Sequence, residues 1–226
     1  MTSKELSEHL TYTYNMQRYD IINEIISKYN INNYLEIGVR YPRDCFDLIN
    51  CNIKMGVDPG EESDNNLATY PYYSDDFFKK LENSELDLPK DYKWDIIFID
   101  GLHLADQSFR DFQNSLNHLS ENGFIVFHDA NPPSIHYARE DYQDHSTIAT
   151  VLWNGTVWKA IQKIRTDYDL DLVTVDTDWG VAVIKNKPNF SILSKNINPF
   201  YEYNTFDKHR KQIINLISVD EFKQWL

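Results

Sequence analysis

The sequence predicts an α/β fold built on a doubly wound, seven-stranded sheet whose last strand is antiparallel. Short apolar runs alternate with amphipathic helical stretches, which is typical of a parallel sheet covered by helices. Only a turn around 178–180 separates the last two apolar runs, so these two strands pair antiparallel. The chain has 226 residues, 42% of them hydrophobic, which suffices for one such domain with helical additions.

Each element has its own signal in the sequence. Apolar residues recur at helical spacing over 15–29, and residues 2–5 match a capping box for a shorter helix before them. Ser74, Asp75 and Asp76 fit the start of another helix. A second capping box at 218–221 predicts a last helical turn. The predicted strands are 34–37, 53–57, 68–73, 94–99, 123–128, 170–175 and 181–184, and the remaining helices are 43–50, 106–119, 155–165 and 207–217.

Numbered along the chain, these strands are expected in the order 3-2-1-4-5-7-6 across the sheet. We expect one domain over 1–226, with N-terminal helices over 1–30, a core over 31–188 and a C-terminal helical extension over 189–226. Within the core, residues 130–154 show no periodicity and are rich in aromatic residues. Long loops of this kind are usually functional or disordered, and the aromatic content favours order.

Charge and composition exclude several classes of protein. The formal net charge is -13 and no cluster of Lys and Arg is present, so a nucleic-acid partner is not expected. No apolar run approaches the length of a membrane span, and the first ten residues do not resemble a signal peptide. Two cysteines are too few for a disulfide framework, so a reduced, cytoplasmic setting is the simplest interpretation. The acidic surface and the C-terminal helices are compatible with a homo-oligomer.

A candidate cofactor site follows the first two strands. Glu36 and Gly38 end the first strand, and Asp58 ends the second, 20 residues after the glycine. An acid at this distance suits the two hydroxyls of a ribose. A dinucleotide is disfavoured because only one glycine is present, whereas S-adenosylmethionine has no phosphate and asks less of the loop. The alternative is that Glu36 and Gly38 form only a strand end and a tight turn.

Several segments together resemble a class I S-adenosylmethionine-dependent methyltransferase, with its Rossmann-like sheet. They include Y-L-E-I-G-V-R, G-V-D-P, D-I-I-F-I-D-G-L-H and N-G-F-I-V-F-H-D-A-N-P, over about 34–186. More narrowly, they resemble the family of macrocin-type sugar O-methyltransferases and cephalosporin-hydroxylase-like proteins. The resemblance implies that S-adenosylmethionine is bound by Glu36, Gly38, Asp58, Ser74, Asp75 and Asp100, with Ser74 and Asp75 beside the adenine.

A candidate reaction centre follows the two strands at 94–99 and 123–128. Asp100, His103, His128 and Asp129 lie at their carboxyl ends, where an open parallel sheet binds ligands. The strands are expected to be neighbours, about 4.8 Å apart, so the two acids can converge. Methyl transfer to a hydroxyl needs in-line placement and removal of a proton.

Two versions of this reaction centre stay open. In one, Asp100 and Asp129 hold Mg²⁺ or another divalent cation, as the resemblance to metal-dependent macrocin-type enzymes implies. In the other, no metal takes part and His or Asp is the base. The second version is favoured by His128, which stands where those relatives often have a second acid. The bland alternative for His128 is a core histidine satisfied by the backbone.

The predicted function is therefore transfer of a methyl group from S-adenosylmethionine to a hydroxyl of a sugar, a glycan or another hydroxylated small molecule. Residues 130–154 would form a lid over this acceptor, with Tyr137, Tyr142 and Trp153 stacking on it or merely packing the lid. A hydroxylase-like or nicotinamide-dependent enzyme on the same fold is one alternative. A non-catalytic cofactor-binding module is the other.

Overall fold

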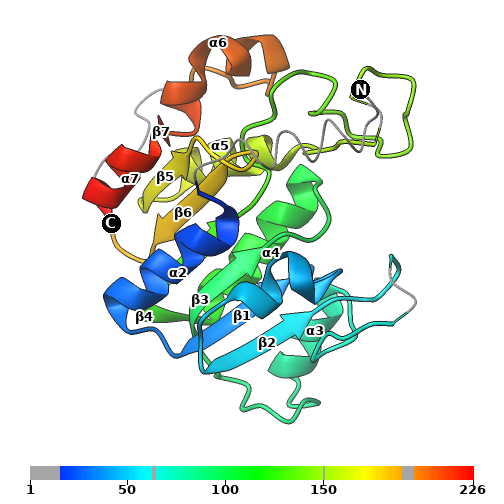
Figure 1. Cartoon of the computed structure of the whole chain (residues 1–226), viewed down its shortest axis with the longest axis vertical. Coiled ribbons are helices and arrows are strands. Elements are labelled where there is room, and N and C mark those ends of the chain that lie inside the picture. The colour runs from blue at the N-terminus through cyan, green and yellow to red at the C-terminus, as the bar shows by residue number, and fades with distance from the viewer. Residues whose placement is uncertain (1–15, 63–64, 150, 190–195) are drawn as a thin grey trace.

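The computed structural model describes residues 16–62, 65–149, 151–189 and 196–226, so the helix expected after residue 2 lies outside the described residues. A seven-stranded sheet runs through the molecule and carries helices on both faces (Figure 1). The strands are β1 (Asn33–Ile37), β2 (Ile53–Val57), β3 (Trp94–Ile99), β4 (Leu119–Phe127), β5 (Asp171–Val175), β6 (Val181–Lys185) and β7 (Leu216–Ile217). The helices are α2 (Arg18–Tyr29), α3 (Ser74–Glu82), α4 (Ala105–Asn117), α5 (Val157–Asp167), α6 (Tyr203–Ile213) and α7 (Val219–Trp225).

The sheet confirms the predicted fold class. Its order is β2-β1-β3-β4-β6-β5-β7, and β6 runs antiparallel to both of its neighbours. Strands β1 to β6 correspond to the predicted strands one, two, four, five, six and seven, which stand in the predicted relative order. Because β1, β3 and β4 are parallel neighbours, their carboxyl ends meet at one edge of the sheet.

The predicted third strand is reduced to a single bridge between Val57 and Tyr70. The amide of Tyr70 donates to the carbonyl of Gly56, and the amide of Asp58 donates to the carbonyl of Tyr70. Pro71 follows directly and has no amide hydrogen, so the ladder cannot continue there. The count of seven is restored by β7, a short strand that the sequence pattern did not reveal, which pairs parallel to β5.

Two predicted helices were wrong in kind or extent. In place of a helix over 43–50 the chain forms two short 3₁₀ turns, Pro42–Asp44 and Phe46–Leu48, because Cys45 between them has the non-helical φ of -151°. At the C-terminal end, α6 stops at Ile213, four residues before the predicted end. Asn215 then takes a left-handed φ of 50°, which turns the chain into β7.

The sheet is covered on both faces, and the side chains of its strands alternate between two hydrophobic clusters. Leu35, Ile97 and Ile125 belong to a cluster with α3, α4, α5 and α6. Ile96 and Phe124 point the other way, into a cluster with α2 and α7. The apolar runs of the central strands follow from this burial on both faces. The C-terminal extension therefore contributes to both sides of the core, through α6 on one face and α7 on the other.

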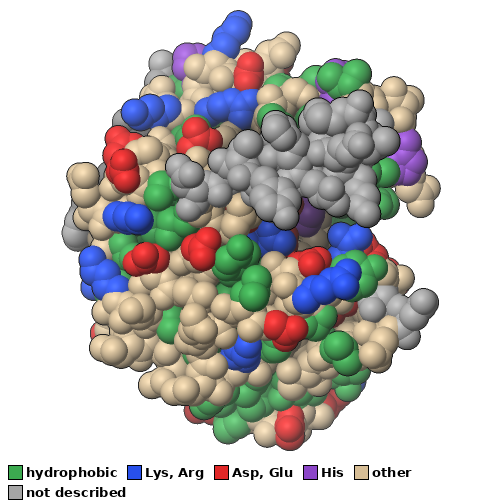
Figure 2. Space-filling model, in the orientation of Figure 1, with side chains coloured by type: hydrophobic (Ala, Val, Ile, Leu, Met, Phe, Trp, Pro, Cys, Tyr) green, Lys and Arg blue, Asp and Glu red, His purple; other side chains and the backbone are tan. Residues whose placement is uncertain are grey.

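The last helix begins as predicted. The Ser218 hydroxyl accepts from the amide of Glu221, and the Glu221 carboxylate accepts from the amide of Ser218, which completes the capping box. None of the helices in the described ranges is long and apolar enough to cross a membrane. On the face shown in Figure 2, acidic and basic side chains are interspersed over the described surface.

Candidate active site

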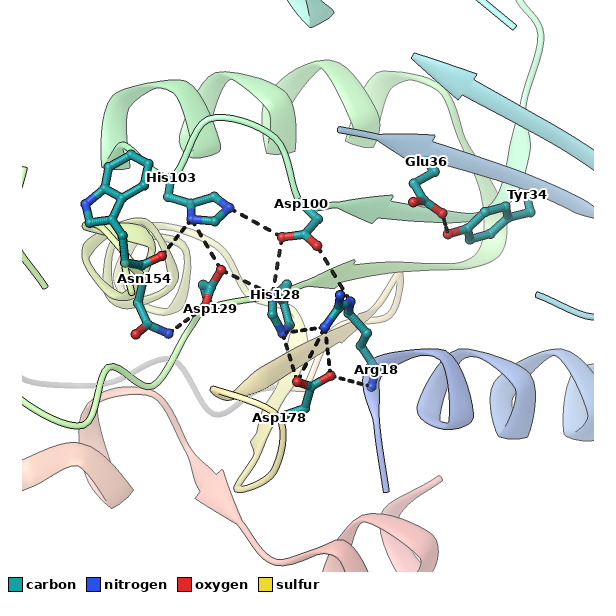
Figure 3. Close-up of polar contacts among 10 residues, drawn as sticks. Arg18, Tyr34, Glu36, Asp100, His103, His128, Asp129, Asn154 and Asp178 are labelled. Carbon is teal, nitrogen blue, oxygen red and sulfur yellow. Dashed lines mark hydrogen bonds and ion pairs between the residues drawn. The ribbon is translucent and has the colours of Figure 1, made fainter. Parts of the chain in front are cut away.

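Two acids and two histidines converge beyond the carboxyl ends of β3 and β4 (Figure 3). Nδ1 of His128 lies 3.2 Å from Oδ1 of Asp100 and 3.1 Å from Oδ2 of Asp129. His103 approaches the same two carboxylates from the other side, with Nε2 3.4 Å from Asp100 and Nδ1 3.3 Å from Asp129. Carboxylates and imidazoles thus alternate in a closed ring. The sequence predicted all four of these residues to meet at this edge.

The charges of this ring shift the pKa values of its members. Burial alone would raise the pKa of Asp100. The positive charges of His128, His103 and Arg18 outweigh burial, so the pKa of Asp100 lies well below its usual value. Burial lowers the pKa of His128, but the carboxylates of Asp129 and Asp100 outweigh burial and hold it well above 6.5. His103 behaves in the same way, with a raised pKa. The cluster therefore stabilises the charged carboxylate of Asp100 and the protonated imidazoles of His103 and His128.

His103 also contacts the end of the insert. Its Nδ1 lies 3.2 Å from the backbone carbonyl of Trp153, and its ring stacks on that of Trp153 at 5.1 Å. Both atoms that face Nδ1, the Trp153 oxygen and a carboxylate oxygen of Asp129, are acceptors, so Nδ1 carries a hydrogen. In the neutral ring, the lone pair is then on Nε2. The side chain of His103 is 21% exposed, which leaves it within reach of a ligand.

Sequence reasoning missed two members of the cluster, Arg18 and Asp178. Nη1 of Arg18 lies 3.1 Å from Oδ2 of Asp178 and 3.4 Å from Nε2 of His128. Asp178 in turn lies 3.4 Å from Nε2 of His128, and its pKa falls to about 2, since His128 and Arg18 outweigh the effect of burial. Asp178 could have been noticed in the sequence because it lies in the tight turn before β6. Nothing in the sequence marked Arg18 except its position in a predicted helix.

Asn154 is a third residue that the sequence did not reveal. It is buried, and its amide nitrogen donates to Oδ1 of Asp129 at 2.5 Å. The next residue, Gly155, has a φ of 62°, and a Cβ there would lie 2.0 Å from the carbonyl oxygen of His103. The end of the insert is therefore packed directly against the loop that carries His103.

Two of the three acids that contact His128, Asp129 and Asp178, have a left-handed backbone conformation. Asp129 has a φ of 59° and Asp178 a φ of 41°, a region that residues other than glycine, asparagine and aspartate rarely adopt. Such conformations often occur at functional sites, where the surrounding structure holds them.

Glu36, expected to bind the cofactor, is buried at the end of β1. It is 1% exposed and accepts a short hydrogen bond from the Tyr34 hydroxyl, two residues earlier on the same face of the strand. Burial raises the pKa of Glu36 to about 8. The carboxyl group is therefore largely protonated at neutral pH as long as its surroundings stay as they are.

Asp58 and Gly38 join the loops that follow β2 and β1. The Asp58 carboxylate accepts from the amides of Arg40 at 2.8 Å and Gly60 at 2.7 Å. Gly38 has a φ of 90°, and a Cβ there would lie 2.2 Å from the carbonyl oxygen of Asp100. The backbone after β1 thus contacts the backbone after β3, where the predicted cofactor site meets the predicted reaction centre.

Ser74 and Asp75 connect α3 to α4. Ser74 is the first residue of α3 and does not cap it; its hydroxyl accepts from Nε2 of Gln107 at 3.1 Å. Asp75 is exposed and lies 3.2 Å from Nε of Arg110. Both lie in the first turn of α3, and these contacts are with the first half of α4.

The insert is irregular in its described part, 130–149 and 151–154, and its aromatic side chains pack on partners within the protein. Tyr137 stacks on Trp179 at 5.5 Å. Tyr142 packs on Trp153 at 5.3 Å, and the other partner of Trp153 is His103. In this structure the three rings therefore pack on other side chains of the protein, which was the alternative to stacking on an acceptor.

Comparison with known proteins agrees with this fold. Residues 46–130 match a family model described as "Methyltransferase domain". No curated protein matches the sequence. The structure is similar to that of a Staphylococcus aureus protein described provisionally as a caffeoyl-CoA O-methyltransferase, with 19% identity and a TM-score of 0.50 over 82% of this chain and 92% of that chain. It is also similar to cofactor-bound Rv0187 from MTB, with 11% identity and a TM-score of 0.52 over 83% of this chain and 90% of that chain.

At these identities the structural likeness shows the fold. The methyltransferase class rests on the family match, which covers β2, β3, α4 and β4 and includes Asp58, Asp100, His103 and Asp129. The expectation of a methyltransferase is confirmed at this level. The match names the domain and no acceptor.

Proposed function

We propose that this chain is an S-adenosylmethionine-dependent O-methyltransferase that methylates a hydroxyl of a small molecule, and that this molecule is a sugar or glycan. The observation that carries the proposal is the ring of carboxylates and imidazoles beyond β3 and β4, in backbone contact with the Gly38 loop. The narrower resemblance to macrocin-type enzymes supports the sugar acceptor.

The residues beyond β1 and β2 fit an adenosyl cofactor. Each oxygen of Asp58 accepts one backbone hydrogen and keeps a lone pair for a ribose hydroxyl. Gly38 allows close approach of the backbone, and Glu36, buried at the end of the same strand, would ionise to bind the cationic end of the molecule. Ser74 and Asp75 would flank the adenine. When bound, the cofactor supplies an electrophilic methyl group on a sulfonium.

The acceptor side needs a base. His103 suits this role, because Asp129 and the Trp153 carbonyl hold a hydrogen on Nδ1, so Nε2 is the nitrogen without a hydrogen when the ring is neutral. Once Nε2 has taken up the acceptor proton, Asp100, at 3.4 Å, accepts the hydrogen bond from it. Asp129 orients the imidazole and stabilises its protonated form after proton transfer. Asp100 lies between His103 and the cofactor loop, where it contacts both sides. Trp153, near the end of the insert, stacks on His103, which supports a role of the insert as the lid of the acceptor site.

The proposal is tested in two steps with the purified chain. Calorimetry should show saturable binding of adenosylhomocysteine and no comparable binding of NAD; the reverse result would overturn the cofactor in favour of a nicotinamide enzyme. Incubation with S-adenosylmethionine and a panel of nucleotide sugars, glycosides and catechols should then release adenosylhomocysteine. Cofactor binding without product from any of these acceptors would favour the non-catalytic module, and product from catechols alone would overturn the sugar acceptor.

A further inference from the structure

His128 occupies the centre of the acid cluster. A single ring nitrogen, Nδ1, lies within 3.2 Å of a carboxylate on either side, Asp100 and Asp129. Ionised carboxylates only accept hydrogen bonds, so Nδ1 must be the donor to both. The opposite nitrogen, Nε2, faces Nη1 of Arg18 and Oδ1 of Asp178 at 3.4 Å each. With a hydrogen on Nδ1 the ring is satisfied in its neutral form, by accepting from Arg18, and in its charged form, by donating to Asp178.

This arrangement bears on the expected metal ion. Asp100, His103 and Asp129 place one potential ligand atom each within 4.8 Å of one another, which meets the first requirement of a metal site. However, Mg²⁺ prefers about six oxygen ligands at roughly 2.0–2.1 Å. Here the two carboxylates are the acidic groups that could bind the ion, and both already accept a hydrogen bond from Nδ1 of His128. An ion that bridged them would meet the hydrogen of that nitrogen, so the residues present do not fit a divalent cation.

The neighbouring charges reinforce this conclusion. Nε of Arg18 lies 3.7 Å from Oδ2 of Asp100, so the outer side of that carboxylate faces a guanidinium. On the far side of Asp129, Asn154 donates its amide hydrogen to Oδ1. The hydrogen bonds and ion pairs described for the two carboxylates thus all come from nitrogen atoms, those of His128, His103, Arg18 and Asn154.

We propose that the imidazole of His128 takes the position between Asp100 and Asp129 that a divalent cation would need, and that it holds the two acids in place for a metal-independent reaction. His128 is then a positioning residue: it sets the carboxylates that orient His103 and face the cofactor loop. The role of His128 in methyl transfer rests on the proposed function. The inference that no metal ion binds between Asp100 and Asp129 does not depend on that function.

The test is a titration with Mn²⁺ followed by electron paramagnetic resonance, with the purified chain and no acceptor. Wild-type protein should show no saturable binding of Mn²⁺ up to millimolar concentrations. The His128→Asp variant exchanges the donor for a third carboxylate and should gain saturable binding. Adding Asp129→Asn to that variant should abolish the gain. His209→Asp, at an exposed position on α6, is the matched control and should gain nothing.

Saturable binding by the wild-type protein that is lost in both Asp100→Asn and Asp129→Asn would overturn the inference. This wild-type measurement decides the matter even if His128→Asp fails to fold. If the variant folds, with an unchanged near-ultraviolet circular dichroism spectrum, and still binds no Mn²⁺, the idea that His128 takes the position of the ion is wrong. Binding of adenosylhomocysteine is scored separately, so the failure of this inference and that of the proposed function are distinguishable.

Discussion

Arg18 and Asp178 are 160 positions apart in the sequence and form a two-point contact. Both the guanidinium and the backbone amide of Arg18 donate to Oδ2 of Asp178, at 3.1 Å and 2.9 Å. The contact joins the first turn of α2 to the turn between β5 and β6. Since both residues also face His128, the first turn of α2 borders the proposed reaction centre.

The Asp178→Asn variant tests how much this contact contributes to stability. Asparagine tolerates the left-handed backbone, so the change removes mainly the charge. We expect a loss of about 2–4 kcal/mol in the free energy of unfolding at pH 7, measured with urea, because a buried charge pair loses one partner. The pKa of Asp178 is about 2 in the folded chain, below its ordinary value of 3.8. The stability that Asp178 contributes is therefore present above pH 4 and lost as the pH falls towards 2. Over this range the free energy of unfolding should fall less steeply in the variant than in the wild-type protein.

The Glu36→Gln variant tests the buried carboxyl group of β1. The amide keeps an oxygen for the Tyr34 hydroxyl but cannot ionise. The folded pKa of about 8 lies above the ordinary value of 4.5, so the stability that Glu36 contributes is present below pH 4.5 and lost as the pH rises to 8. The free energy of unfolding of the wild-type protein should thus fall by at most about 1.4 kcal/mol per pH unit relative to the variant. An equal pH dependence of urea unfolding in both proteins would contradict this, and the exposed Glu24→Gln serves as control.

The pH profile of kcat/KM tests His103 as the base. A base must be deprotonated to act, and the carboxylates raise the pKa of His103 above 6.5. Activity should therefore increase with pH along a limb that lies above 6.5. His103→Gln should lower kcat by roughly 100-fold or more while adenosylhomocysteine binding stays unchanged. His209→Gln, on the exposed side of α6, should have wild-type activity. An unaltered profile in His103→Gln would exclude this role.

The Asp58→Ala variant tests the cofactor site by calorimetry. Loss of hydrogen bonds to a charged group corresponds to roughly 1.5–3 kcal/mol, so adenosylhomocysteine should bind about 10- to 100-fold more weakly. Asp47→Ala changes an exposed acid nearby and should leave the affinity unchanged. Asp129→Asn should also keep the affinity, since we assign its carboxylate to the acceptor side. Wild-type affinity in Asp58→Ala would refute the assignment of the ribose site.

The Arg210→Ala variant tests the contact between α6 and the segment that follows Asp129. Nη1 of Arg210 donates to Oδ1 of Asn131 at 2.6 Å and to the carbonyl of Pro132 at 2.8 Å, and Nη2 donates to the Tyr203 hydroxyl. Removing these bonds should lower the free energy of unfolding by about 1–3 kcal/mol. Arg43→Ala, at a side chain that is 80% exposed, should have an effect near zero. Equal stability of both variants in urea would show that α6 is not held by this contact.

The sequence predicted most of the sheet because the central strands are buried on both faces and so appear as compact apolar runs. It also predicted that Asp100 and Asp129 converge, since the carboxyl ends of parallel neighbours meet at one edge. It failed where the outcome depended on a single residue, as at Tyr70, where Pro71 stops the ladder, and at Cys45, where one non-helical residue divides a helix into two turns.

The wider site could not be predicted in the same way. Arg18 reaches His128 only because α2 packs across the sheet, and Asn154 reaches Asp129 only because the insert folds back over β4. Both contacts depend on tertiary packing, for which spacing along the chain holds no signal. Glu36 and Tyr34 are different, because residues two apart in a strand share a face, so their contact was open to prediction.

The close approach of Gly38 to Asp100 has a consequence for how two reactants would be aligned. A Cβ at position 38 would lie only 2.2 Å from the Asp100 carbonyl oxygen, so the loops beyond β1 and β3 approach each other here through main-chain atoms. With a methyl donor on the first loop and an acceptor on the second, as we propose, the distance between them would follow from the spacing of the two strands. Side-chain changes around the pocket would then alter which acceptor is taken without changing the transfer distance.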